Sequence, residues 1–194
     1  MDKTPLSRHQ RRRLRTREQI KQAGVKLLLE VGYDAISIQH ITDEADLGRG
    51  TFYLHFKDKE DLVWSIIKDG IDVTDQEAQQ HLDQAPPANP EFFGYLNMFR
   101  HAEQNKDLYR VMLGSQGSAI LTAQVHAYLA DELCRDMRTH PIYQDFDIPH
   151  DVLSQIVTGA TIRLIIWWLE NPNTYSARQM AEMLFECIHH RKIQ

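Results

Sequence analysis

The chain has 194 residues, 42% of them hydrophobic, which is enough apolar material for one sizeable domain or for a small domain joined to a larger one. Its net charge of −5 hides an asymmetry, because residues 1–26 hold nine basic and two acidic residues whereas residues 71–194 hold nine basic and sixteen acidic residues. The composition disfavours a disulfide scaffold, since Cys134 and Cys187 lie far apart, and it disfavours a membrane protein, since the longest nearly apolar stretch, Ile162–Leu169, is much shorter than the ~20 residues of a spanning helix.

Apolar residues at three- and four-residue spacing predict a first helix from Leu14 to Val31, with Gly32 as its C-terminal stop. Residues 1–13 before it form a basic arm, which has no apolar run of the kind that a signal peptide or membrane anchor needs. Ser37 is placed to cap a short second helix. The inward positions of that helix are Ile38, Ile41 and Ala45.

The rest of the chain also has helical periodicity. Asp58 is expected to cap a helix that runs to about Leu82, before a proline-rich break. Further helices are expected from Asn89-Pro90 through Phe99, from about Leu108 to Leu113, from about Ser118 to Met137, from His150 to Glu170, and from Ser176 to about His190. No alternating run is long enough for a strand, so the fold class is predicted to be all-α, with about nine helices.

The stretch 49–56 combines glycines, aromatic residues and a histidine in an unusual way. On a helix at about 100° per residue, Phe52 and Phe56 fall on one side, while Gly50, Thr51 and Leu54 fall on the other. A glycine, a threonine and a leucine make an unusual surface for water, but they suit a DNA groove, where thymine methyl groups and base edges are exposed. Tyr53 and His55 at the edges of this face, and Lys57 and Lys59 beyond it, suit phosphate oxygens.

Together, residues 37–56 have the spacing of a helix-turn-helix, in which Asp46-Leu47-Gly48 forms the turn. Gly48 is expected to end this turn with a positive φ or a close helix contact, and Gly50 to remove bulk from the outer surface. An ordinary helical corner plugged by aromatic side chains is the alternative interpretation of the same residues.

The wider pattern favours the helix-turn-helix: Gly32-Tyr33, then Ala35, Ser37, Ile38, Ile41, Ala45 and Leu47, and then residues 50–62, GTFYLHFKDKEDL. This pattern resembles the N-terminal DNA-binding region of the TetR/AcrR family of bacterial transcriptional regulators, and the match covers about residues 14–67. Asp46 and Gly48 depart from the small residue and the serine or threonine cap that are usual there.

The resemblance implies a three-helix DNA-binding domain over residues 14–57, followed over 58–194 by a larger helical domain that binds an effector and dimerises. It also implies a palindromic double-stranded DNA operator, a homodimer, a small-molecule effector, a cytoplasmic location and, most often, repression. A protein of the same fold that acts as a coactivator or through another regulator is the alternative. The residues that we expect at the DNA are Arg12, Arg13, Arg15, Ser37, Arg49, Gly50, Thr51, Tyr53, Leu54, His55, Lys57 and Lys59.

The basic residues of the arm and of the first turn after it suggest contact with an adjacent minor groove. A tail that only improves solubility is the alternative. If several such contacts form, binding should depend steeply on salt, because each neutralised phosphate adds about −0.9 to the slope of log affinity against log salt concentration.

The segment 150–170 leaves almost no polar face, so a soluble protein must bury it on more than one side. We expect it and the last helix to pack partly against a second copy of the chain, with Gly159 allowing close approach; burial within one monomer is the alternative. The predicted dimer contacts are Ile156, Gly159, Trp168, Met180, Leu184 and Ile188.

Between these parts lie many aromatic residues and methionines, which are more often core residues than ligand contacts. The resemblance implies that some of them line an effector pocket. The candidates are Trp64, Phe99, Tyr109, Met112, His126, Arg163 and Trp167. Arg163 is expected to be buried, either paired with an acidic residue or facing a ligand.

Catalysis is not expected, because the sequence contains no nucleotide-binding glycine loop. Cys187, His189 and His190 form a single cluster of metal-ligand types at the end of the chain, which a chain with ten histidines produces easily by chance. The chain is therefore predicted to need neither a metal nor a cofactor.

Overall fold

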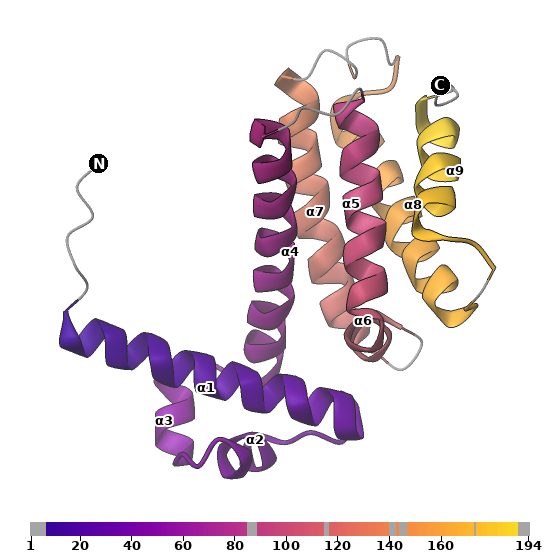
Figure 1. Cartoon of the computed structure of the whole chain (residues 1–194). Helices are drawn as coiled ribbons and strands as arrows, with labels where there is room; N and C mark the ends of the chain where they lie inside the picture. The colour runs from indigo at the N-terminus through magenta and orange to yellow at the C-terminus, as the bar shows by residue number, and fades with distance from the viewer. Residues whose placement is uncertain are drawn as a thin grey trace. The chain divides into compact units, whose positions relative to one another are not determined.

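The computed structural model describes residues 7–84, 89–114, 117–139, 143, 147–172 and 174–189. Within these residues the chain forms nine helices and no strand, which confirms the predicted all-α class. The chain divides into two compact units, residues 1–68 and residues 69–194, and each is considered by itself (Figure 1).

The first unit contains α1 (Arg8–Val31), α2 (Ile38–Glu44), α3 (Arg49–Tyr53) and the first part of α4 (Lys59–Gln84). Their apolar faces enclose a small core, in which the larger side chains are Ile20, Leu28, Tyr33, Ile36, Ile41, Phe52, Phe56, Leu62 and Val63. Gly24 of α1 allows close contact with α4, because a Cβ there would lie 3.1 Å from a methyl carbon of Leu62 and 3.3 Å from one of Ile66. This packing extends the first unit to residue 68, beyond the predicted domain boundary after residue 57.

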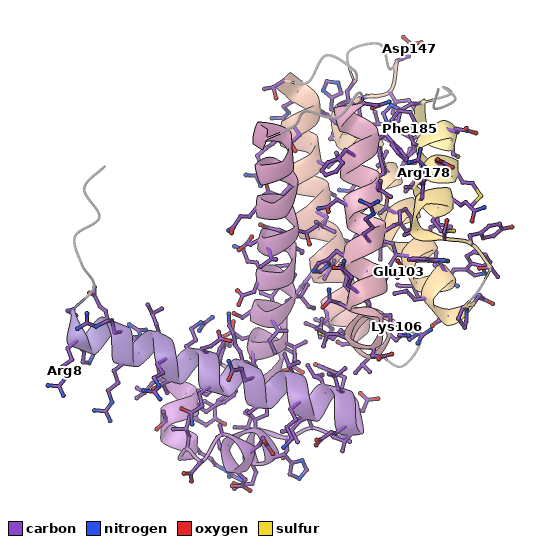
Figure 2. All side chains as sticks on the ribbon, viewed as in Figure 1. Arg8, Glu103, Lys106, Asp147, Arg178 and Phe185 are labelled. Atoms are coloured by element: carbon purple, nitrogen blue, oxygen red, sulfur yellow. The ribbon has the colours of Figure 1, made fainter. Side chains whose placement is uncertain are left out.

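Helix α1 begins at Arg8 rather than at Leu14, so residues 8–13 of the predicted basic arm are helical (Figure 2). The cause is a capping box: the Gln10 N–H donates to the Ser7 hydroxyl at 3.2 Å, and the Ser7 N–H donates to the Gln10 side chain at 2.8 Å. Residues 1–6 of the predicted arm lie outside the described residues.

The second unit contains the rest of α4 together with α5 (Pro90–Gln104), α6 (Lys106–Leu113), α7 (Ala119–Thr139), α8 (His150–Glu170) and α9 (Ala177–His189). Helix α5 lies alongside α9, and α7 lies alongside α8 (Figure 1). The larger core of this unit joins α5, α8 and α9. Phe185 of α9, labelled in Figure 2, packs edge-to-face on Phe92 and on Tyr95 of α5, with ring centroids 6.0 and 5.9 Å apart.

Helix α8 is, among the described residues, the one helix long and apolar enough to span a bilayer by length and composition. However, 56% of its most apolar window is buried inside the protein, as is usual for a core helix of a globular domain. The end of α8 is held by Arg110 of α6, whose guanidinium Nε donates to the carbonyl of Leu169 at 2.7 Å and whose Nη2 donates to the same oxygen.

Candidate nucleic-acid interface

The turn between α2 and α3 obtains its shape from Asp46 and not from a glycine. Asp46 has a φ of 50°, in the left-handed region that aspartate tolerates better than most side chains do. Gly48 has a φ of −77° and a ψ of 150° as the N-cap of α3, and an added Cβ would meet nothing within 4 Å. The expectation that Gly48 needs a positive φ or a close helix contact is therefore wrong.

Helix α3 divides into a buried face and an exposed face, as its sequence predicts. Phe52 and Phe56 are 0% and 2% exposed, with ring centroids 5.8 Å apart. On the other side, Leu54 is 73% exposed and Tyr53 is 57% exposed, and a Cβ on the exposed Gly50 would meet nothing within 4 Å. Thr51, beside them, is half-buried. The result is a low, uncharged outer surface on a helix that is anchored by two phenyl rings.

Arg17 of α1 fixes the end of this helix in place. Its guanidinium donates to the backbone carbonyl of His55 at 2.6 Å and to the hydroxyl of Ser65 at 2.9 Å, and it lies 4.1 Å from the centre of the Phe56 ring. The prediction that the whole basic segment contacts DNA misses this structural role of Arg17. The spacing of Arg17 from the buried residues Ile20 and Leu28 could have shown that it lies on the inner face of α1.

Three of the predicted DNA contacts, Arg12, Arg13 and Arg15, are exposed on α1. Burial lowers the pKa of His55, and the positive charges of Arg13 and Arg17 lower it further. The effect of Arg13 shows that the positive field of α1 extends to the end of the exposed face of α3. A lowered pKa favours the neutral form of His55, so the positive charge at this end of α3 comes mainly from the arginines of α1.

The two predicted lysine contacts have different surroundings. Lys57 is exposed, and its backbone N–H donates to Asp61 at 2.9 Å. Lys59 instead turns inward: its ammonium donates to the carbonyls of Tyr33 at 2.9 Å and Ile36 at 3.2 Å, and it lies 4.2 Å from the Tyr33 ring centre. The structure thus contradicts the prediction that Lys59 reaches a phosphate, since these bonds tie the start of α4 to the loop before α2.

The two remaining predicted contacts in this unit make hydrogen bonds within α2 or to it. Ser37 caps α2, as predicted, by accepting from the His40 N–H at 3.2 Å. The exposed Arg49 donates through Nε to the side chain of Gln39 at 2.6 Å. Gln39 was not predicted as a site residue, but it orients the arginine that begins α3.

The predicted effector residues lie in different surroundings. Trp64 lies in the first unit, whereas Phe99 and Met112 are buried in the second. The Tyr109 hydroxyl forms a hydrogen bond with His101 at 2.9 Å. Burial raises the pKa of the Tyr109 hydroxyl to about 12. Ring nitrogen Nε2 of His126 lies 3.3 Å from the Gln155 carbonyl oxygen. Arg163 is exposed, which contradicts its predicted burial, and Trp167 is 37% exposed.

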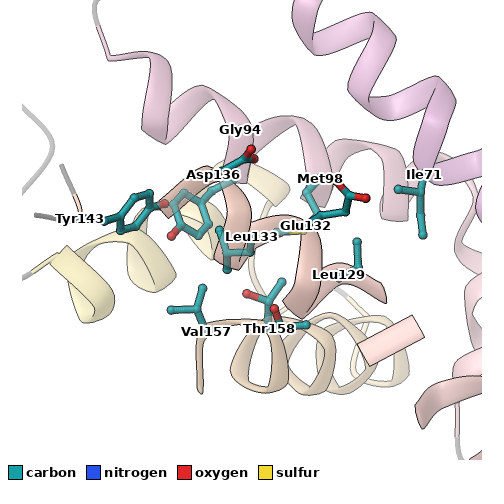
Figure 3. Close-up of a pocket in the computed structure, with 12 residues that line it drawn as sticks. Ile71, Gly94, Met98, Leu129, Glu132, Leu133, Asp136, Tyr143, Val157 and Thr158 are labelled. Atoms are coloured by element: carbon teal, nitrogen blue, oxygen red, sulfur yellow. The ribbon is translucent and has the colours of Figure 1, made fainter. Parts of the chain in front are cut away.

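A cavity of about 320 Å³ lies elsewhere in the second unit (Figure 3). None of the seven predicted effector residues lines it. Its lining comes from α4, α5, α7, α8 and Tyr143, and consists of Ile71, Gly94, Tyr95, Met98, Leu129, Glu132, Leu133, Asp136, Tyr143, Val157, Thr158 and Thr161. The sequence shows only that Leu129 and Leu133, and likewise Glu132 and Asp136, share one face of a helix at four-residue spacing, which does not by itself indicate a cavity.

Several of the predicted dimer residues are parts of the protomer's own core. Trp168, Met180 and Leu184 are at most 5% exposed and pack between α5, α8 and α9, so the structure contradicts their assignment to a surface between copies. Ile188 is partly buried against the same core. A Cβ on Gly159 would lie 3.3 Å from the His126 ring, so this glycine allows α7 to approach α8 within one chain.

Ile156, by contrast, is 54% exposed. It belongs to a stripe of residues at three- and four-residue spacing along α8. This face of the helix is not buried within the chain. The exposed members of this α8 stripe are Val152, Ile156, Ala160, Arg163 and Trp167.

No metal site emerges from the described residues, where no three histidine, cysteine, aspartate or glutamate side chains group together. Cys187 is exposed and His189 is buried against Tyr95, and His190 lies outside the described residues.

A short outward-facing α3, placed after a tight turn from α2 and clamped by α1, defines a helix-turn-helix DNA-binding unit, which is joined here to a larger helical unit. This is the architecture of a transcriptional regulator with a DNA-binding domain. Residues 20–66 match the model of the bacterial regulatory proteins of the tetR family, and residues 92–190 match a transcriptional regulator C-terminal region. The chain belongs to the TetR family of transcriptional regulators, whose members are regulators and not enzymes.

Individual relatives agree with this assignment. An HTH-type transcriptional regulator of Staphylococcus aureus is 40% identical over 57 residues, which cover 29% of this chain and 31% of the relative; the match therefore spans about a third of that protein. NalD of Pseudomonas aeruginosa, the secondary repressor of the MexAB-OprM multidrug efflux pump, has a similar fold, with a TM-score of 0.67 at 19% identity over 91% of this chain and 95% of NalD.

The transcriptional regulator FadR of Bacillus subtilis, whose structure is a complex with stearoyl-CoA, is also similar. Its TM-score is 0.63 at 19% identity, over 88% of this chain and 96% of FadR. At these identities the two solved structures establish the fold alone.

Proposed function

We propose that the chain is a cytoplasmic repressor that binds a palindromic DNA operator as a homodimer and is released by a small-molecule effector. The observation that carries the DNA part is the exposed face of α3, where Leu54 and Tyr53 project to solvent beside Gly50 while Phe52 and Phe56 hold the helix in place. A leucine that is 73% exposed on so short a helix contributes little to folding, but it can contact a thymine methyl in the major groove.

The roles of the surrounding side chains follow from their exposure and charge. Arg49, Gly50, Thr51 and Leu54 face the bases in this proposal. Tyr53, His55 and Lys57 contact the phosphates next to α3, and Arg12, Arg13 and Arg15 extend the phosphate contacts along α1. Because Arg8–Arg13 are helical, these arginines approach the backbone from a helix and not from a flexible arm.

Fluorescence anisotropy with the DNA that flanks its own gene, measured over a range of salt concentrations, tests this assignment. Lys57→Ala should make the slope of log affinity against log salt shallower by about 0.9 per protomer, and Leu54→Ala should weaken binding to the operator but not to random DNA. Lys106→Ala in α6 is a charge-matched control that should change neither. If Lys57→Ala and Tyr53→Phe leave affinity for the operator unchanged in a folded dimer, the DNA assignment is wrong, and action through another regulator becomes the better account.

The homodimer is proposed from the α8 stripe and the neighbouring surface of α9. Val152, Ile156 and Trp167 on α8 and Met183 on α9 are 47%, 54%, 37% and 42% exposed, which is unusual for side chains of this size in water. A second copy that covers both surfaces would bury them and would give the DNA site two-fold symmetry.

Light scattering during size-exclusion chromatography distinguishes a dimer from a monomer. Ile156→Glu should convert the dimer to a monomer, because a two-fold contact places the new charge in the interface twice. Ile120→Glu, on a more exposed isoleucine of α7 (63%) outside this surface, should leave the dimer intact. A monomeric wild-type protein at micromolar concentration would contradict the dimer.

Effector release is proposed from the cavity of the second unit, by analogy with FadR, whose structure contains stearoyl-CoA. Repression is proposed by analogy with NalD, which is a repressor. Helix α4 lines the cavity with Ile71 and also contributes its first residues to the DNA-binding unit. A ligand that favours one position of α4 therefore changes the population of the DNA-binding form. Effector and operator should weaken each other's binding by the same factor, which a titration of each in the presence of the other measures.

A further inference from the structure

The cavity of the second unit carries an electrostatic preference that can be derived from its lining. Two carboxylates, Glu132 and Asp136, stand one turn apart on α7, and among the described residues the lining contains no lysine, arginine or histidine. Figure 3 shows Glu132 and Asp136 among the labelled side chains of one wall, with Val157 and Thr158 on the wall that α8 supplies.

The charges close to the cavity do not cancel those carboxylates completely. Arg135 pairs with Glu132 from a position that is itself 63% exposed, so it neutralises part of the charge of that residue from the solvent side. Asp136 is exposed at the surface and also lines the cavity. An anionic group in the cavity would therefore lie near a net negative charge, whereas a cation would gain from it.

The remaining lining completes a surface for an amphipathic molecule. Ile71, Met98, Leu129, Leu133 and Val157 offer apolar contact. Tyr95 and Tyr143 supply aromatic rings, and ring faces attract organic cations. Tyr95 is buried and bonds to the ring of His189 at 3.2 Å, and burial raises the pKa of its hydroxyl, so it remains a neutral hydroxyl at physiological pH. The hydroxyls of Thr158 and Thr161 add polar groups from α8.

We propose that this cavity binds a small amphipathic cation, an amine or quaternary ammonium attached to an aromatic or aliphatic body, with Glu132 and Asp136 as the counter-charges. A cavity of about 320 Å³ is at the small end of ligand sites in proteins, so the ligand is a compact molecule. This inference rests on the proposed effector function, and it specifies the chemical class of the effector. It also predicts a preference opposite to that expected for an acid or an acyl thioester with a phosphorylated head group.

Three probes with the same body and different head groups test the charge preference: phenylbutylamine, phenylbutanol and phenylbutyrate, each titrated into the full-length protein by calorimetry. We expect the amine to bind roughly tenfold more tightly than the alcohol, since two partly exposed counter-charges are available, and the butyrate to bind more weakly than both. Equal affinities, the reverse order, or no binding of the amine at millimolar concentration would overturn the proposal.

Variants assign the effect to the two carboxylates. In the double variant Glu132→Gln with Asp136→Asn the amine should bind no more tightly than the alcohol. Asp131→Asn, which removes an exposed acid on the same helix outside the cavity lining, is the matched control and should retain the tenfold preference. If Asp131→Asn reduces the preference as much as the double variant does, the attraction is a general surface effect and the proposed site is wrong.

A variant of the cavity shape provides a second, charge-free test. Gly94 lines the cavity, and a Cβ added to it would meet nothing within 4 Å. Gly94→Leu should therefore fold normally and weaken the binding of the amine and the alcohol alike, by about the same factor. Unchanged amine affinity in a folded Gly94→Leu protein would show that the amine binds elsewhere, and would overturn the proposal.

The same measurements separate this inference from the proposed function. If the amine binds with the expected preference but leaves the operator complex intact at saturation, the chemical class of the ligand stands and release by that ligand fails. If an anionic compound releases the operator and competes for the cavity, the effector function stands and the cation inference fails.

Discussion

The two units hold their helices in place by different means. In residues 1–68, long polar side chains reach backbone carbonyls in turns: Arg17 bonds to His55, Gln19 to Ala45 at 2.6 Å, and Lys59 to Tyr33. In residues 69–194, long helices pack through aromatic and aliphatic side chains, as Phe99 and Trp168 do with ring centroids 5.6 Å apart.

The difference follows from helix length. Helices α2 (Ile38–Glu44) and α3 (Arg49–Tyr53) are far too short to be stable by themselves in water, and α3 also has to leave one face unburied. Side chains that clamp the turns make this possible, because they stabilise the helix ends without covering the outer face. The helices of the second unit are long and need no clamped turns to stay folded. Their polar groups can therefore line a cavity.

The sharpest test of this comparison contrasts Phe52 of α3 with Leu54, the C-cap of the same helix. Phe52→Ala should lower the free energy of unfolding of the first unit by about 3–5 kcal/mol, because the ring is 0% exposed. Leu54→Ala, two residues on, should leave that free energy nearly unchanged, because the side chain is 73% exposed. Urea unfolding followed by circular dichroism measures both.

At low temperature, the two variants should differ in how they lose affinity for the operator. Leu54→Ala should weaken operator binding while remaining folded, whereas any loss in Phe52→Ala should track the unfolded fraction. A large loss of stability in Leu54→Ala would mean that Leu54 is a structural residue and would remove the main support for the DNA-binding surface.

The clamp from α1 gives the next largest effect. Arg17→Ala should destabilise the first unit by about 2–3 kcal/mol, because it removes two hydrogen bonds made by a charged group and one contact with an aromatic ring. Arg17→Lys should recover only part of this loss, since an ammonium cannot form both bonds in the same fork. Arg12→Ala, on the exposed side of α1, is the control, and should alter the salt dependence of DNA binding but not stability.

The sequence was most informative where one physical rule dominated. Helical spacing alone placed Phe52 and Phe56 inside and Leu54 outside, because a short amphipathic helix beside a core has only one way to bury two rings. It failed for Lys59, since the choice between a phosphate and the carbonyls of Tyr33 and Ile36 depends on how α4 meets the preceding loop. No periodicity encodes that geometry.

In the second unit the sequence showed that α8 is apolar but not which residues face inward. Trp167 and Trp168 are adjacent, yet the first is 37% exposed and the second is 5% exposed, because successive residues of a helix point about 100° apart. Which of them faces α5 is decided by the packing partner. The cavity was missed for the same reason: its lining comes from four helices and Tyr143, a set that only tertiary packing brings together.

A smaller effect is expected for the polar contact that the second unit does use. Arg110→Ala should destabilise that unit by about 1–2 kcal/mol, because the guanidinium donates two hydrogen bonds to the Leu169 carbonyl at the negative end of α8. Arg100→Ala on α5, an exposed arginine, should cost much less. If both variants unfold at the same urea concentration as the wild type, the second unit gains nothing from its helix clamp and relies on packing alone.

The smallest expected effect is a pH dependence confined to the first unit. Burial and the charges of Arg13 and Arg17 lower the pKa of His55 in the folded protein, so the unfolded chain binds a proton there more readily than the folded chain does. Stability from this group is therefore fully present above the unfolded histidine pKa of about 6.5 and is lost as the pH falls through and below it. Thermal unfolding of the DNA-free protein between pH 7.5 and about pH 5, for the wild type and for His55→Gln, isolates the contribution of His55 to stability. The wild type should lose more stability than the variant on acidification.

Bound operator should reduce this difference between the wild type and His55→Gln, because phosphates near His55 favour its protonated form and raise its pKa. If the operator leaves the difference unchanged, His55 lies away from the phosphates and its place in the DNA-binding surface is wrong.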